Sequence, residues 1–363
     1  MSSLFTERTR QDLRPARHAE SHYAYLDASG RPAFEYVRGL FDEWFANYPA
    51  SQRADLAGRF ASKHDRHHLA AAFELFLHEV LRRMGCDVEV HPAIDGHSKK
   101  PDFRCSPLSG DAFYVEAVTV GNEDEFGYSP GENAVLDAIN ELHCPNFWLW
   151  ADQCGTVGGS PPLRRLRVEA QRWIDQLDYE ALNAEPKDRL PAPSFEFLNG
   201  EWTLRLGAIP RGAARGDESA RPLGNAFTKG GWGDGSESLR SAIARKATSY
   251  GRFPGTLIIA VNALSIAADS ESYLRAIGPT PGTRSESPLR AHVAAVLGFR
   301  GVFPWTVDVA DGRIFPNADA AASIPDVLRP LPQGRSGRDG QMEFQDGTQP
   351  RELLNLPPII PMG

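Results

Sequence analysis

The chain has 363 residues, of which 41% are hydrophobic and 24% charged, and its formal net charge is −8. These values are typical of a globular protein, and the acidic balance disfavours a broad nucleic-acid surface while leaving room for a local basic groove. No apolar run has the length of a signal peptide or a membrane span, so we expect no membrane partner. The four cysteines show no CxxC spacing, which disfavours a disulfide frame or zinc ribbon and fits a cytoplasmic location.

Residues 1–62 are expected to form a polar arm followed by two helices. The segment before Pro32 is polar and carries several arginines, which is typical of a loosely held arm. From Pro32 to about Asn47 apolar residues recur at helical spacing, and Ser51 is placed to cap a short second helix that ends at Phe60. We expect these helices to pack as an N-terminal extension against the core.

The strongest amphipathic pattern in the chain is a helix over Leu69–Met84, which Gly85 ends. Glu74 lies on the flank of its apolar stripe, where it can face a sheet. His64 and His68 stand at one-turn spacing near the start of this helix. We interpret them as part of a solvated helix start rather than as metal ligands, because no carboxylate pair stands at matching spacing.

After a strand at 86–90, two further strands form a predicted hairpin. One begins at Pro101-Asp102-Phe103, the other is Tyr114–Val120, and the breaker-rich residues 106–110 join them. Glu116 shares one face of the second strand with aromatic and β-branched residues. Because burying an unpaired charge is costly, this carboxylate needs a cation or an opening to water. Asp102, at the start of the neighbouring strand, is placed to share that cation.

The rest of the chain alternates between helical and strand patterns. We expect helices at 132–143, 163–182, 238–250, 270–277 and 289–297, and strands at 146–150, 195–197, 202–206, 256–262 and 301–309. The Asn199-Gly200 pair marks the two strands around it as a hairpin. Residues 63–310 would form one α/β core, and residues 311–363 an extended tail rich in proline, glycine and charge.

Residues 207–237 are the longest irregular segment and contain many glycines. Such an insertion is either a solvated connector or a functional loop. In the second interpretation Arg211, Arg215 and Lys229 are weak candidates for contacts with phosphates. The two interpretations are equally compatible with the residues.

The order of the acidic residues resembles the PD-(D/E)XK nuclease superfamily, which has the restriction-endonuclease-like fold. The resemblance covers residues 69–120, and more loosely 236–262, with Glu74 on the helix, Asp102 after a proline and Glu116 on the next strand. It implies an α/β fold with a mixed central sheet flanked by helices, to which the N-terminal helices are added.

The resemblance also implies a site for Mg²⁺ or Mn²⁺. Asp102 and Glu116 would hold the ion together with the backbone carbonyl of Val115 or Ala117, because Mg²⁺ prefers a few oxygen ligands and retains several waters. Glu74 would hold a second ion or orient a water molecule. The alternative is that Asp102 is a turn residue and Glu116 a charge on an edge strand.

One position departs from the superfamily pattern, because Val118 stands where a lysine is expected. In some members the lysine lies on a nearby helix, and Lys246 is the matching candidate here. Lys246 and Tyr250 lie one turn apart, a spacing that resembles the glutamine and tyrosine of exonuclease-like members. Lys99 and Lys100 are a second choice, next to Asp102.

The function implied by the resemblance is metal-dependent hydrolysis of DNA phosphodiester bonds. It further implies a bacterial defence or mobile-element context and protein partners from such a system. The departure at Val118 keeps open a catalytically inactive binding or structural module with the same fold. A hydrolase of small phosphorylated metabolites is a third hypothesis, and it would require a closed pocket at the acids.

Overall fold

The computed structural model describes residues 3–121, 129–158, 160–184, 193–216, 221–225, 235–250, 253–265, 268–278, 287–337 and 341–359. Within these ranges, none of the helices combines the length and the apolar composition needed to cross a membrane.

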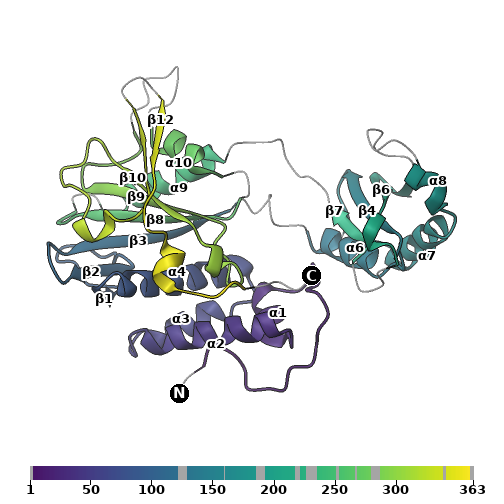
Figure 1. The fold of residues 1–363 in the computed structure, drawn as a ribbon, viewed down its shortest axis with the longest axis horizontal. Helices are drawn as coiled ribbons and strands as arrows, with labels where there is room; N and C mark the ends of the chain where they lie inside the picture. The colour runs from purple at the N-terminus through teal and green to yellow at the C-terminus, as the bar shows by residue number, and fades with distance from the viewer. Residues whose placement is uncertain are drawn as a thin grey trace. The chain divides into compact units, whose positions relative to one another are not determined.

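The chain is divided into two compact units (Figure 1). The first is built from residues 1–14, 21–122 and 232–362, and the second mainly from 15–20 and 123–231. The second unit is therefore an insertion in the first. The prediction of a single core over 63–310 therefore differs from the structure. The sequence did not reveal the division, because the pattern of alternating helices and strands continues across both units.

The first unit contains an eight-stranded mixed sheet of order β1-β2-β3-β8-β9-β10-β11-β12. The strands are β1 (Cys86–Val90), β2 (Phe103–Pro107), β3 (Phe113–Val120), β8 (Leu257–Ala263), β9 (Val293–Arg300), β10 (Gly312–Pro316), β11 (Gln333–Ser336) and β12 (Met342–Gln345). β3, β8 and β9 are parallel neighbours, whereas β1, β2 and β3 pair antiparallel. The α/β fold with a mixed central sheet is confirmed.

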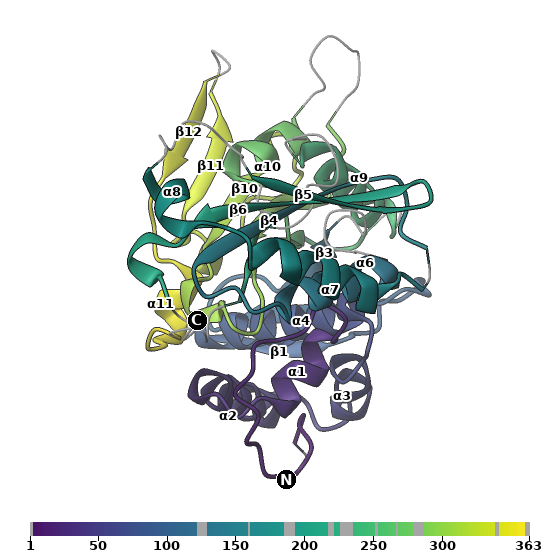
Figure 2. The same cartoon turned by 90° about the vertical axis from the view of Figure 1, so that its right-hand side faces the viewer.

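Helices cover both faces of this sheet (Figures 1 and 2). On one face α4 (Asp65–Arg83) packs against β1 and β3, and α1 (His22–Ala28), α2 (Pro32–Asn47) and α3 (Arg53–Phe60) pack against α4. On the other face lie α9 (Ser236–Thr248) and α10 (Ser270–Ile277). β3 contributes to a separate buried cluster on each side, with Val115 in the cluster of α4 and Val118 in that of α9. The N-terminal helical extension is confirmed.

The segment before the helices is not the loosely held arm that we expected. Leu4 and Phe5 are buried in the cluster of α4. The buried Asp27 carboxylate accepts hydrogen bonds from the Thr6 backbone and from the Arg10 guanidinium. The polar composition hid this anchoring, because Arg8 and Arg10 both pair with the buried Asp27.

The second unit has its own four-stranded sheet, of order β5-β6-β4-β7, and its own buried cluster. Its elements are α6 (Pro130–Asn140), β4 (Phe147–Cys154), α7 (Leu163–Ile174), α8 (Tyr179–Ala184), β5 (Ser194–Asn199), β6 (Trp202–Pro210) and β7 (Leu223–Asn225). The hairpin through Asn199-Gly200 is confirmed, with Gly200 at φ 65°. The single helix predicted over 163–182 is wrong, because the chain breaks between α7 and α8.

Three predictions for the C-terminal part are also wrong. Residues 311–363 are not a tail, because they supply β10, β11 and β12 and the short helix α11 (Pro350–Leu354). The predicted helix at 289–297 is instead the approach to β9 and most of that strand. The predicted strand at 301–309 contains the short 3-10 turn Val307–Val309. A strand buried on both faces is apolar throughout, and periodicity alone does not distinguish it from a buried helix.

Candidate metal and catalytic site

The three predicted acids reach the same part of the first unit from both faces of its sheet. Glu74 comes from α4, Glu116 from the opposite side of β3, and Asp102 immediately precedes β2. The pairing of β2 with β3 begins at Phe103 and Val115. Asp102 lies one residue beyond the end of this pairing, where its side chain reaches the backbone of β3.

Asp102 is held at this position by the backbone of β3. Its Oδ2 accepts the Ala117 N–H at 2.7 Å. Successive residues of a strand direct their backbone N–H and C=O groups to opposite neighbouring strands. The backbone groups of Val115 and Ala117 point toward β2 rather than β8. Since β2 covers Val115, the Ala117 carbonyl is the better placed of the two predicted backbone ligands.

Glu116 is buried and lies between the predicted Lys246 of α9 and Tyr250, which follows that helix. The Lys246 Nζ is 2.5 Å from its Oε1, and the Tyr250 hydroxyl donates to its Oε2 at 2.5 Å. Burial and the Glu116 charge raise the pKa of Tyr250, so this hydroxyl stays a proton donor. The structure thus places Lys246 at the acid of the strand on which Val118 replaces the expected lysine.

Glu74 is also buried and has two partners from the N-terminal extension. Its Oε1 accepts the Tyr48 hydroxyl at 2.6 Å, and its Oε2 accepts Nη1 of Arg59 at 2.6 Å. Burial, reinforced by the Glu74 charge, raises the pKa of Tyr48. Both carboxylate oxygens are therefore engaged, and the extension holds this acid in place.

Asp102 has the most unusual electrostatics of the three acids. Burial, and then the charges of Glu116 and Glu74, raise its pKa to about 8. The Lys246 charge and the Ala117 N–H act in the opposite direction but do not compensate. A divalent cation beside Asp102 would relieve this repulsion, which is the behaviour expected of a metal ligand.

His91 belongs to this site, although the sequence analysis did not assign it. One ligand atom from each of Glu74, His91 and Asp102 lies within 4.8 Å of the others, a grouping that can hold a metal ion. His91 follows β1 with φ 49°, in the left-handed region that few residues other than glycine adopt. Its signal in the sequence was weak, since only its place after a strand and ahead of Pro101-Asp102 marks it.

The donor set fits a divalent ion. Asp102 belongs to two possible sets of ligands. One is the predicted pair of Asp102 with Glu116, and the other is the triad of Asp102, Glu74 and His91. Carboxylates and a carbonyl suit Mg²⁺ and Mn²⁺, and an imidazole is an additional ligand for transition-metal ions. Asp102 is therefore the centre of the candidate site in either arrangement.

Nothing matched this chain in comparisons with family models, with curated proteins or with solved structures. The interpretation of the site therefore rests on its residues and their geometry.

The predicted phosphate-binding arginines that the structure describes have partners within the second unit. Arg211 and Arg215 belong to the second unit. The Arg211 guanidinium donates to the Phe147 carbonyl and stacks on Trp148, and Arg215 pairs with Glu180. Both have structural partners there, which accounts for their positions. Lys229 lies outside the described residues.

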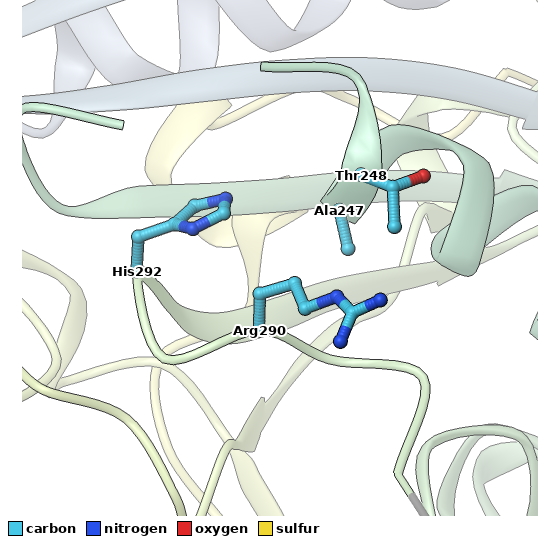
Figure 3. A pocket seen from close by; sticks show the side chains of 4 residues that line it. All are labelled: Ala247, Thr248, Arg290 and His292. Atoms are coloured by element: carbon cyan, nitrogen blue, oxygen red, sulfur yellow. The ribbon is translucent and has the colours of Figure 1, made fainter. Parts of the chain in front are cut away.

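A pocket of about 390 Å³ opens beside α9, lined by Ala247, Thr248, Arg290 and His292 (Figure 3). Ala247 directly follows Lys246 in the chain. None of these four described lining residues is an acid. The pocket therefore does not supply the enclosed acidic cavity that a hydrolase of small metabolites would require.

The pairing of Glu74 can be tested through stability. We expect Arg59→Ala to lower the free energy of unfolding by about 3 kcal/mol, because it leaves the buried Glu74 carboxylate with Tyr48 as its hydrogen-bond donor. Urea unfolding of both proteins measures the difference. Arg82→Ala is the matched control, with an expected cost below about 1 kcal/mol, since the buried Glu79 keeps its ion pair with Arg83. Equal costs for the two substitutions would contradict the pairing argument.

Proposed function

We propose that this protein is a metal-dependent nuclease that hydrolyses DNA phosphodiester bonds. The observation that carries the proposal is the convergence of Asp102, Glu116 and Lys246 from three separate elements, with Lys246 directly on Glu116. Metal-dependent phosphodiester hydrolysis uses a bound divalent cation, and a further positive charge near the phosphate stabilises the transition state. These residues can provide both.

Each residue has a distinct part in this proposal. Mg²⁺ or Mn²⁺, when bound, supplies positive charge to the transition state and activates the attacking water. Asp102 binds the ion, and the Ala117 N–H orients the carboxylate. Lys246 donates a hydrogen bond to an oxygen of the scissile phosphate. The Tyr250 hydroxyl donates a hydrogen bond to Oε2 of Glu116, whereas Lys246 contacts Oε1. Together these contacts keep the Lys246 ammonium and the Glu116 carboxylate in fixed relative positions.

A second candidate is a catalytically inactive module with the same fold. It is favoured by the pairing of the acids, because Glu74 is engaged by Arg59 and Glu116 by Lys246. In that case the ion pairs are structural, and the protein acts by binding. A bacterial defence or mobile-element context, with DNA and protein partners, belongs to the proposal in either case.

The experiment is a cleavage assay with the full-length protein and Mg²⁺ or Mn²⁺. We expect hydrolysis of DNA and of a phosphodiester such as bis(p-nitrophenyl) phosphate, but not of the monoester p-nitrophenyl phosphate. Glu116→Gln should reduce the rate at least about 100-fold, the scale of a lost electrostatic contact in the transition state. Glu89→Gln, an exposed acid on β1, is the control and should change little.

Three results would reject the nuclease. Absence of DNA cleavage with either ion, combined with retained folding, supports the inactive module. Cleavage of the monoester alone supports the metabolite hydrolase. Equal activity of Glu116→Gln and the wild type would show that any cleavage arises elsewhere.

A further inference from the structure

We propose that His91 is a direct ligand of the divalent ion, and that it makes the site prefer transition-metal ions such as Mn²⁺ to Mg²⁺. The inference deepens the proposed function, because it concerns the same ion beside Asp102.

The first argument is the spacing of the three donors. The Nε2 of His91 is 3.8 Å from Oδ1 of Asp102 and 3.9 Å from Oε1 of Glu74. Both separations are too long for a hydrogen bond. They fall between the distances expected for two ligands of one octahedral ion with bonds of about 2.1 Å, which are about 3.0 Å for adjacent and about 4.2 Å for opposite ligands. The spacing of the three donors is therefore compatible with one ion after small side-chain adjustments.

The second argument concerns the other ring nitrogen. The Nδ1 of His91 is 3.5 Å from the side-chain oxygen of Gln52. Gln52 directly precedes α3 and can accept the Nδ1–H. In that tautomer Nε2 carries a lone pair directed at two carboxylate oxygens, which is unfavourable unless a cation lies between them. Metal-binding histidines commonly donate their second N–H to such an acceptor, which fixes the tautomer and the ring orientation.

The third argument is the backbone that holds the ring. The His91 N–H donates to the Asp102 carbonyl at 2.9 Å, which continues the pairing of β1 with β2 by one residue. His91 adopts its positive φ at this point. Strained conformations that the surrounding structure maintains occur preferentially at functional sites. The backbone thus keeps His91 beside Asp102 at an energetic cost.

The preference for the ion follows from ligand chemistry. Mg²⁺ is a hard ion that loses water reluctantly and prefers oxygen ligands. An imidazole nitrogen contributes more to the binding of first-row transition ions than to that of Mg²⁺. A site with two carboxylates and His91 should therefore bind Mn²⁺ more tightly than Mg²⁺, and the difference should depend on the imidazole.

The test uses the full-length wild-type protein, His91→Asn and the control His67→Asn, an exposed histidine near the start of α4. Calorimetric titrations give the affinities for Mn²⁺ and Mg²⁺. In His91→Asn we expect Mn²⁺ binding to weaken at least about 10-fold, the scale seen when groups around a metal are lost, with a much smaller change for Mg²⁺. Pulsed electron paramagnetic resonance of bound Mn²⁺ should show coupling to an imidazole nitrogen in the wild type and in His67→Asn.

Mn²⁺ bound to the wild type without nitrogen coupling, or equal weakening of both ions in His91→Asn, would overturn the assignment. The wild-type spectrum decides the question even if His91→Asn does not fold. Nitrogen coupling without any DNA cleavage would keep the ligand assignment and reject the nuclease. DNA cleavage without nitrogen coupling would keep the nuclease and reject His91 as a ligand. A wild-type protein that binds no Mn²⁺ would reject the metal site altogether.

Discussion

Asp102→Asn should stabilise the ion-free protein at alkaline pH and remove its affinity for divalent ions. The pKa of Asp102 is raised to about 8 in the folded state, whereas an aspartate in an unfolded chain has a pKa of about 3.9. The folded state therefore binds the proton more tightly. The stability that this proton contributes is full below about pH 4 and is lost as the pH rises to about 8. Each pKa unit corresponds to about 1.4 kcal/mol, so the variant should gain several kcal/mol above pH 8.

Urea unfolding with a chelator at pH 5, 7 and 9 measures this effect, and the gain should grow from pH 5 to pH 9. Asp87→Asn, an exposed acid on β1, is the control and should show no such trend. In a second series, Mn²⁺ at about 100 times its dissociation constant should stabilise the wild type by about 2.7 kcal/mol but leave Asp102→Asn unchanged. A gain that does not depend on pH would contradict the electrostatic argument.

Lys246→Ala should lose cleavage while keeping the ion. The ammonium acts on the phosphate in our proposal, so we expect the rate to fall about 10²–10³-fold and the Mn²⁺ affinity to change only a few-fold. The variant also leaves the buried Glu116 with Tyr250 as a partner, and its unfolding must be measured alongside. Single-turnover cleavage and calorimetry separate the two effects.

Two controls accompany this variant. Arg245→Ala removes a neighbouring exposed cation of α9 and should cleave at the wild-type rate. Lys100→Ala tests the second choice made from the sequence. If Lys246→Ala cleaves normally and Lys100→Ala does not, the role moves to the segment before Asp102. If neither loses activity, neither Lys246 nor Lys100 takes part in cleavage.

The sequence predicted the elements of the site well because their signals are local. The helix around Glu74 has an uninterrupted apolar stripe, and the hairpin with Asp102 and Glu116 has turn residues between alternating strands. Lys246 was chosen as the candidate lysine from helical spacing and a resemblance, and the structure adds its contact with Glu116. A local pattern does not reveal which distant side chain pairs with a buried acid. The ion pair of Glu74 with Arg59 was therefore missed.

His91 and the second unit were missed for different reasons. A histidine after a strand has no periodicity to mark it, and its backbone hydrogen bond with Asp102 is a contact between distant positions that no local pattern reveals. The second unit was absorbed into one core because its helices and strands follow the same patterns as those of the first. Strand β9 was predicted as a helix since burial on both faces removes the alternation that identifies strands.

The insertion of the second unit has a consequence for the order of folding. Glu116 and Lys246 are separated by 130 positions, most of which belong to the inserted unit. Closing so long a flexible loop is entropically costly, and long-range contacts of this kind form slowly. A compact insert acts as a much shorter connection than the same residues unfolded. The pairing of β3 with β8 and the contact of Lys246 with Glu116 should therefore form after the insert has collapsed, which makes the candidate site one of the last parts of the molecule to assemble.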